Sequence, residues 1–229
     1  MDRNGIFCHG VCLKNKRPSN MDRILLCRGE IKTSPLAFFA VCDGVGSSEL
    51  GEQVAEFVVQ RLEEWFYKQK TFRQIDQSLG KEIFLINQDI VEKRKGKSGS
   101  CTLSGILATP EKNFFVHVGD SRIYQQTKNK FRPMTEDHVT EKGELFDFMG
   151  KEHDLAIDFW EEPQRGGSYL LCSDGFYHLM DWELAFLSLC RASRSKIGKI
   201  IEELTELVIA KGERDNCSVI YCNIDGIAS

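Results

Sequence analysis

The chain has 229 residues, of which 41% are hydrophobic and 28% charged, with a formal net charge of −4. That length suits one domain, or two small ones at most. Because there is no basic excess, neither nucleic acid nor an anionic membrane surface is expected as the main partner.

The predicted elements alternate irregularly along the chain. Apolar runs predict strands at Ile6–Cys12, Arg23–Cys27, Leu36–Cys42, Cys101–Thr109, Phe114–Val118, Arg122–Gln126, Tyr169–Cys172 and Cys217–Asn223. Apolar residues three and four apart predict amphipathic helices over Glu49–Lys68, Gln74–Lys95 and Lys196–Lys211. Since strict β-α-β alternation is absent, this order predicts an α+β fold, with largely antiparallel sheets covered by helices.

The lack of a recognisable targeting segment and the pattern of cysteines both favour a cytoplasmic protein. No apolar run approaches the roughly 20 residues that cross a bilayer, and the opening segment MDRNGIFCHGVC lacks the apolar core of a signal peptide. The nine cysteines are odd in number, form no C-x-x-C pair and mostly lie within apolar runs. We therefore expect free, buried thiols. Cys8, His9 and Cys12 match no zinc spacing.

Aspartates stand at the edges of four apolar strands: Asp43 in FFAVCDG, Asp120 in FFVHVGDSR, Asp174 in YLLCSDG and Asp215 in GERDNCSVI. A single Asp-Gly is a common turn signal, but turn chemistry does not require an apolar strand beside each aspartate. If the strand ends converge, the carboxylates share one cavity and cannot all stay ionised without compensation. A hard divalent cation would provide the compensating positive charge, and ligation by oxygen atoms alone points to Mg²⁺ or Mn²⁺ rather than zinc. Two such ions about 3.5–4 Å apart commonly serve phosphate-ester hydrolysis.

Other motifs do not match a known chemistry. The GKS at residues 96–98 is not a phosphate-binding loop, because Val91 stands where its first glycine should be. CDGVG is not an aspartyl-phosphate nucleophile, because Val45 replaces the second aspartate, and no G-x-S-x-G elbow is present. His117 and His138 are interpreted as structural. Arg17 could hold a phosphate bidentately, but residue type alone favours an exposed loop arginine.

Seven motifs taken together resemble one family. They are R-x-x-N-x-D, FAVCDGVG, SGSCTLSGIL, VGDSRIY, TEDH, LLCSDG and RDNCSVI, and they span residues 17–222. Their order and spacing are similar to those of bacterial-type, metal-dependent serine/threonine protein phosphatases of type 2C. The resemblance implies that residues 1–229 form one catalytic domain. It also implies a four-layer α-β-β-α fold, in which helix pairs flank a sandwich of two antiparallel sheets and the metals lie at one end.

The resemblance also implies roles for individual residues. Asp43 would bridge two Mn²⁺ or Mg²⁺ ions and the Gly44 carbonyl would bind one of them, while Asp174 and Asp215 would bind the other. Asp22 would hold a metal-bound water, Asp120 with Asp174 a weaker third ion, and Arg17 the substrate phosphate. Asn216 would support the last ligand.

The chain departs from the family pattern at three places. Met21 stands where the family has a glutamate that contributes to the second metal, and a thioether is a poor ligand for a hard cation. Val45 replaces a histidine that some members carry as general acid. The segment between His138 and Gly150 is shorter than the usual flap.

The expected activity is hydrolysis of phosphoserine and phosphothreonine in protein substrates by direct attack of a metal-bridging water. Such an enzyme would oppose a serine/threonine kinase. Met21 keeps open a second hypothesis, a catalytically weak or inactive regulatory module with the same fold. A third hypothesis is a phosphatase of small phosphorylated metabolites, since a metal site contacts only the phosphate group of its substrate.

Overall fold

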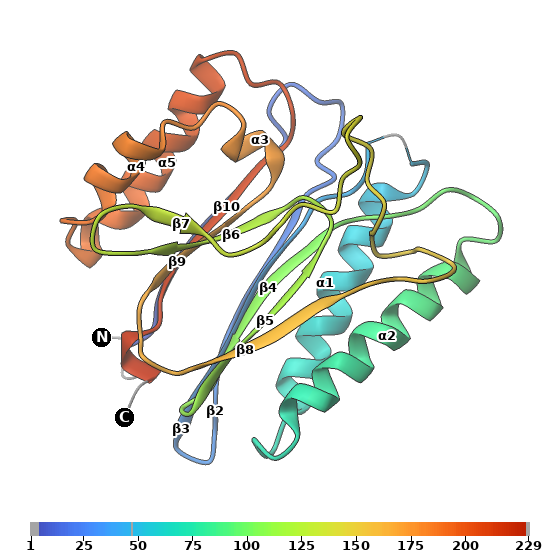
Figure 1. The fold of residues 1–229 in the computed structure, drawn as a ribbon, viewed down its shortest axis with the longest axis horizontal. Coiled ribbons are helices and arrows are strands. Elements are labelled where there is room, and N and C mark those ends of the chain that lie inside the picture. The colour runs from blue at the N-terminus through green and yellow to red at the C-terminus, as the bar shows by residue number, and fades with distance from the viewer. Residues whose placement is uncertain (1–4, 47, 228–229) are drawn as a thin grey trace.

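A computed structural model describes residues 5–46 and 48–227. Within them, two antiparallel sheets form a sandwich (Figure 1). One sheet has the order β1-β10-β9-β6-β7, and the other β2-β3-β4-β5-β8. The strands of the first sheet are β1 (Phe7–Leu13), β10 (Cys217–Asn223), β9 (Ser168–Cys172), β6 (Arg122–Gln126) and β7 (Phe131–Pro133). Those of the second are β2 (Arg23–Ile31), β3 (Ser34–Cys42), β4 (Leu103–Ala108), β5 (Lys112–Val118) and β8 (Asp158–Pro163).

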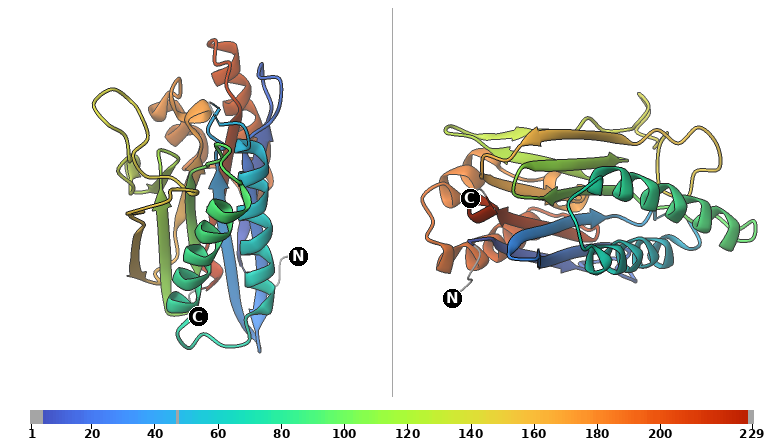
Figure 2. Two further views of the ribbon diagram at one scale, coloured as in Figure 1. Left: turned by 90° about the vertical axis from the view of Figure 1, so that its right-hand side faces the viewer. Right: turned by 90° about the horizontal axis from the view of Figure 1, so that it is seen from below.

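Helices cover both outer faces of the sandwich. Helices α1 (Gly51–Lys68) and α2 (Ile75–Lys93) lie side by side against the β2-β3-β4-β5-β8 sheet (Figure 2). Helices α4 (Trp182–Leu189) and α5 (Arg194–Ala210) pack on the other sheet. A single turn, α3 (Asp174–Tyr177), follows β9, and a 3₁₀ turn, η1 (Asp225–Ile227), follows β10. The predicted α+β sandwich flanked by helix pairs is confirmed.

Strand β3 shows how the four layers are held together. Its side chains alternate between the faces of the sheet. Phe38 and Ala40 pack toward α1 and α2, whereas Phe39 and Val41 pack between the two sheets. All four are fully buried, which is why the sequence there is continuously apolar. Burying each phenylalanine contributes about 1.5–3 kcal/mol, so β3 anchors both cores directly before Asp43.

The predicted strands and long helices are all present, with ends that differ by a few residues. The pattern did not predict β7, β8, α3 or α4. Strand β8 carries three acidic side chains on a sheet edge, so it lacks the apolar run expected of a strand. Helix α4 has apolar residues on all sides and only eight residues, too few to show a helical period.

Two further expectations concern the cysteines and the membrane. All nine cysteines are free, and six of them are buried, as expected. Among the described residues, no helix combines the length and the apolarity needed to cross a membrane.

Candidate active site

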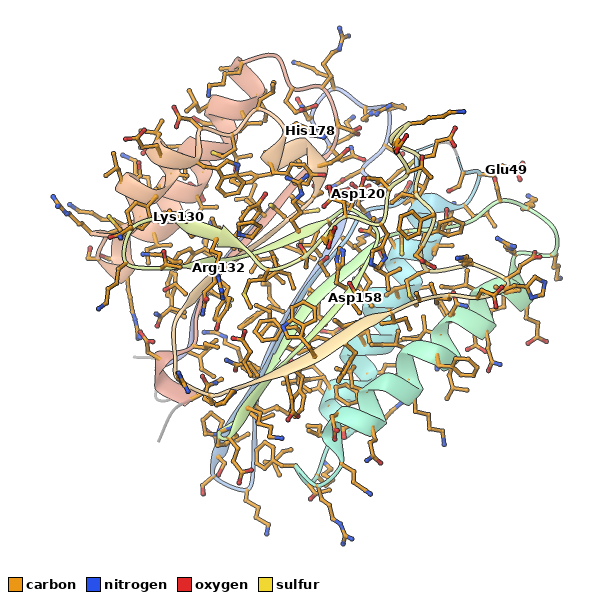
Figure 3. The ribbon with its side chains drawn as sticks, in the orientation of Figure 1. Glu49, Asp120, Lys130, Arg132, Asp158 and His178 are labelled. Atoms are coloured by element: carbon orange, nitrogen blue, oxygen red, sulfur yellow. The ribbon has the colours of Figure 1, made fainter. Side chains whose placement is uncertain are left out.

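A cavity of about 620 Å³ opens at one end of the sandwich. Asp43, Asp120, Asp174 and Asp215 line it, with Arg17 at the same mouth. Figure 3 shows Asp120 at this end, where the loops between the strands gather. The fold explains the convergence. Strands β3, β5 and β9 end here, and β10 begins here because it runs antiparallel to β9.

Asp43 lies where the aspartates interact most strongly. Its backbone N–H donates to Thr102 Oγ1 at 2.9 Å, and Thr102 Oγ1 lies 2.7 Å from Ser121 Oγ. Burial, then the nearby charges of Asp22, Asp174, Asp120 and Asp215, raise the pKa of Asp43 well above its ordinary value. A carboxylate held under such repulsion favours a proton or a cation beside it.

The neighbouring aspartates share this electrostatic strain. Burial, followed by the charge of Asp174, raises the pKa of Asp120 to about 6. Burial, followed by the charge of Asp215, raises the pKa of Asp174. The cavity therefore concentrates negative charge that the described side chains compensate only in part.

Asp22 lies behind the cavity and does not line it. Its side chain is fully buried, and burial raises its pKa to about 6. Ser173 Oγ donates to Asp22 Oδ2 at 2.8 Å, whereas Oδ1 has no hydrogen-bond partner among the described residues. An orphaned buried carboxylate oxygen is costly. A metal or its water at the cavity floor would satisfy it.

Arg17 contacts a predicted metal ligand. Its Nε donates to Asp215 Oδ1 at 2.7 Å, and its Nη2 forms a second, short bond to Oδ2. This bidentate pair occupies both oxygens of Asp215. The Arg17 side chain is 52% exposed and that of Asp215 is 32% exposed, so the pair is weak enough to separate when a competing ligand binds.

Asn216 organises the loop that carries Arg17. Its Nδ2 donates to the carbonyls of Lys14 at 2.8 Å and Ser19 at 2.9 Å, while its Oδ1 accepts from Met21 N at 2.8 Å. One amide thus fixes three points of the β1–β2 loop. Because Asn216 follows Asp215 directly, it couples the position of that loop to the predicted ligand.

The glycines after Asp43 and Asp174 are required by close packing. A Cβ on Gly44 would lie 2.7 Å from backbone atoms of Gly51, and a Cβ on Gly175 would lie 1.9 Å from Asn216 O. Neither glycine has a positive φ. The recurring Asp-Gly thus lets another segment of backbone approach each aspartate.

The donor set suits a hard divalent cation, although it is not yet arranged as a complete cage. Four carboxylates line the cavity, and oxygen ligands are those that Mg²⁺ and Mn²⁺ prefer. Among the described residues, no group of three Asp, Glu, His or Cys side chains is placed to hold a metal ion. Arg17 already engages both carboxylate oxygens of Asp215, one of the predicted ligands. Met21 lines the cavity at the departure from the family pattern and adds no oxygen.

Both histidines interpreted as structural have scaffold contacts. His117 is buried, with its Nδ1 2.9 Å from Ser104 Oγ and its Nε2 2.9 Å from Glu136 O. Burial lowers its pKa to about 4, so it is neutral. His138 Nδ1 accepts a long hydrogen bond from Gly119 N, and its Nε2 faces Asp158.

Several cavity residues were not singled out from the sequence. The short segment after His138 contributes Gly143, Glu144, Leu145 and Phe148 to the lining. Ser173, which donates to Asp22 behind the cavity, was likewise not singled out. Its position directly before Asp174 in LLCSDG is a signal that could have found it, because a polar residue ends the buried strand there. The flap residues carry no such signal.

Comparison with known proteins assigns the family. The sequence model described as "Protein phosphatase 2C" matches residues 19–207. A serine/threonine phosphatase stp from Listeria welshimeri is 27% identical over 211 residues, which cover 79% of this chain and 81% of that protein. The chain belongs to the protein phosphatase 2C family, and it is a protein phosphatase by class.

Solved structures of low sequence identity agree on the fold. Serine/threonine phosphatase Stp1 from Staphylococcus aureus has a TM-score of 0.83 at 20% identity, covering 96% of this chain and 95% of its own. The serine/threonine phosphatase PstP/Ppp from Mycobacterium tuberculosis has a TM-score of 0.80 at 19% identity, covering 96% and 99%. The sandwich and its flanking helices are thus common to this chain and to both structures.

Proposed function

We propose that this chain is a metal-dependent phosphatase that hydrolyses phosphoserine and phosphothreonine in proteins. The observation that carries the proposal is the cavity, where four aspartates from both sheets and one arginine meet. An acidic cavity repels a phosphate monoester unless cations compensate the charge. The arrangement is therefore suited to bound divalent cations plus a guanidinium at the mouth.

The proposed ligands follow from this geometry. Asp43, the Gly44 carbonyl, Asp174 and Asp215 would hold two Mn²⁺ or Mg²⁺ ions, and Asp120 with Asp174 could hold a weaker third. Ions bound there would supply Lewis acidity and an activated water for direct attack on phosphorus. The fully buried Asp22 would orient water at the cavity floor through the oxygen that lacks a partner.

Arg17 and Asn216 perform the positioning. Arg17 would bind two oxygens of the substrate phosphate in the fork geometry that it now uses on Asp215. Asn216 holds the Arg17 loop at Lys14, Ser19 and Met21. The loop would therefore not have to become ordered when substrate binds, which reduces the entropic cost of positioning.

Turnover by the wild type and by Asp174→Asn tests this function. Wild type with Mn²⁺ should hydrolyse a phosphothreonine peptide and p-nitrophenyl phosphate. Without divalent ions it should hydrolyse neither substrate. Asp174→Asn should lower kcat at least 100-fold. In EDTA its melting temperature should be equal to or above that of wild type, because it removes one charge from a repulsive cluster. Unchanged turnover in the folded variant would refute the metal-ligand role of Asp174.

A catalytically weak regulatory module is the second candidate. Two observations favour it: Met21, whose side chain offers no oxygen ligand, lines the cavity, and Asp215 is engaged by Arg17. Isothermal titration of Mn²⁺ and an ester-hydrolysis assay together distinguish the module from the enzyme. A regulatory module would bind Mn²⁺ weakly and would hydrolyse no phosphate ester at any Mn²⁺ concentration. Sugar phosphates assayed beside the peptide separate a metabolite phosphatase from a protein phosphatase.

A further inference from the structure

Basic side chains gather beside the mouth of the cavity. Lys14 and Lys16 lie on the β1–β2 loop that carries Arg17, and Arg214 directly precedes Asp215. All three are exposed, and none forms an ion pair with a described residue. We call these three residues the basic rim. The proposed catalytic roles leave them unused.

The backbone of the basic rim is fixed. Asn15, which has a left-handed φ of 51°, donates from Nδ2 to Glu213 O at 2.8 Å. Asn216 Nδ2 donates to Lys14 O at 2.8 Å. The loop carrying the lysines is thus fastened to the segment that carries Arg214, while the charged side chains remain free.

Two acidic groups lie close by, and both are already engaged. Glu213 Oε1 accepts from the backbone nitrogens of Arg214 at 2.8 Å and Asp215 at 2.9 Å. Asp215 is paired with Arg17. The three free cations of the basic rim therefore exceed the acidic charge beside them.

The basic rim lies within reach of a substrate in the cavity. Lys16 and Arg214 are sequence neighbours of Arg17 and Asp215, which line the cavity, and consecutive Cα atoms are about 3.8 Å apart. On the flap, the cavity lining instead contributes an acid, Glu144. A substrate segment whose phosphate binds Arg17 would therefore meet positive charge at the β1–β2 loop.

We propose that the basic rim is a subsite for a second anionic side chain of the substrate, near in sequence to the phosphorylated residue in the cavity. The proposal rests on the proposed function and narrows its substrate class to segments with a second phosphate or a carboxylate. Free lysines act as flexible point charges that suit a solvated anion. A phosphate, with about twice the charge of a carboxylate, is the stronger ligand.

Three peptides of one sequence test the subsite. The first carries a single phosphothreonine, the second has another phosphothreonine two residues away, and the third has glutamate there. The second and third peptides are each made in two versions, with the added residue on the N-terminal or on the C-terminal side of the first phosphothreonine. With Mn²⁺, kcat/KM for the better doubly phosphorylated peptide should be about tenfold above the single one, with glutamate between them, as expected for a few exposed charge contacts. The preference should shrink at high salt.

The double variant Lys14→Glu/Lys16→Glu should abolish this preference and leave the hydrolysis of p-nitrophenyl phosphate unchanged. Its fold should persist, because Asn216 holds the loop through the backbone carbonyls of Lys14 and Ser19 and not through the lysine side chains. Lys128→Glu/Lys130→Glu is the matched control. It makes the same charge change on the exposed β6–β7 hairpin, and Figure 3 shows Lys130 well away from Asp120. The control should keep the preference.

The two proposals fail differently. Equal kcat/KM values for the three peptides on wild type would show that the basic rim is ordinary solvated surface, even with normal hydrolysis. A preference that survives Lys14→Glu/Lys16→Glu, or that Lys128→Glu/Lys130→Glu also removes, would equally overturn the subsite. If wild type with Mn²⁺ hydrolyses no peptide and no p-nitrophenyl phosphate, the proposed function itself is wrong.

Discussion

Among the described glycines, Gly175 beside the cavity is the one that another backbone segment approaches most closely. A methyl group there would lie 1.9 Å from Asn216 O, so either the turn of α3 or the start of β10 must move. We expect Gly175→Ala to lower the free energy of unfolding by about 3 kcal/mol, at the upper end for overpacking. Urea unfolding followed by circular dichroism measures the loss.

Gly80 gives the control for this substitution. It lies within α2, and no heavy atom lies within 4 Å of an added Cβ. Gly80→Ala should therefore raise the free energy of unfolding by up to about 1 kcal/mol through helix propensity. If Gly175→Ala were as stable as Gly80→Ala, the close approach would not explain the Asp-Gly pair.

If Asp215 binds a metal ion as proposed, Arg17 competes with that ion for its carboxylate, and this competition predicts opposite effects of one substitution. Arg17→Ala releases both carboxylate oxygens, so Mn²⁺ affinity should rise up to about fivefold, the limit for a partly exposed ion pair. Turnover should fall about 100-fold, because the phosphate loses its guanidinium. Isothermal titration and steady-state kinetics separate the two effects.

Arg132→Ala serves as the comparison, because Arg132 lies on β7 and contacts Gln125 rather than the cavity. It should change neither quantity. Weaker Mn²⁺ binding by Arg17→Ala would mean that Arg17 helps to form the metal site instead of competing for it.

At the scale of elements, the sequence predicts those segments whose burial follows a regular pattern, either continuous or periodic. Strand β3 is buried on both faces, so its unbroken apolar run marks both its presence and its end at Asp43. Strand β8 is a sheet edge with three acidic residues among its six, and α4 is apolar all round. Neither shows the pattern expected of its class, because their neighbours in space, and not local periodicity, determine their burial.

The same reasoning separates the predictable from the unpredictable part of the site. The strand-end aspartates are recognisable, because a carboxylate beside an apolar strand is unusual in sequence. The partners of Asn216 are 195–202 residues away from it in the chain, so no local pattern encodes them. The Arg17–Asp215 pair, separated by 198 residues, is equally a product of the fold.

Helix α4 depends on its N-cap more than the longer helices do. Asp181 Oδ1 accepts from Leu184 N at 3.0 Å, whereas α1, α2 and α5 have no side-chain cap. Asp181→Ala should cost about 1 kcal/mol, which lowers the melting temperature by about 2–4 °C in a protein of this size. Asp181→Asn keeps the acceptor and should remain within 1 °C of wild type; an equal loss in both variants would point to charge instead of capping.

At the scale of the whole molecule, the fold holds together mutually repelling carboxylates, so its stability depends on what neutralises them. Burial raises the pKa of Asp22 from 3.8 to about 6, so the folded state binds this proton more tightly than the unfolded chain. The resulting stability is present below pH 4 and is lost as pH rises through about 6. The loss is on the order of 3 kcal/mol, since one pKa unit is about 1.4 kcal/mol.

Asp22→Asn isolates this contribution, because asparagine can still accept from Ser173 Oγ but carries no charge. In EDTA, the variant should gain stability over wild type as pH rises from 4 to 7.5, with the difference measured by urea unfolding at each pH. Ionisable groups far from Asp22 titrate alike in both proteins and cancel in this difference. The Asp22 charge also raises the pKa of Asp43, so the loss of that repulsion in the variant adds to the difference in the same direction. A difference that stays constant with pH would exclude the raised pKa of Asp22 as its source.

Divalent cations should replace the proton as the neutralising charge. Mn²⁺ is expected to stabilise wild type more at pH 7.5 than at pH 5, because protons on the cavity aspartates oppose ion binding at the lower pH. The rise in melting temperature with Mn²⁺, measured at both pH values against EDTA, tests this. An equal rise at the two pH values would place the bound ion away from the aspartates, since only ligands that must lose a proton make its binding depend on pH.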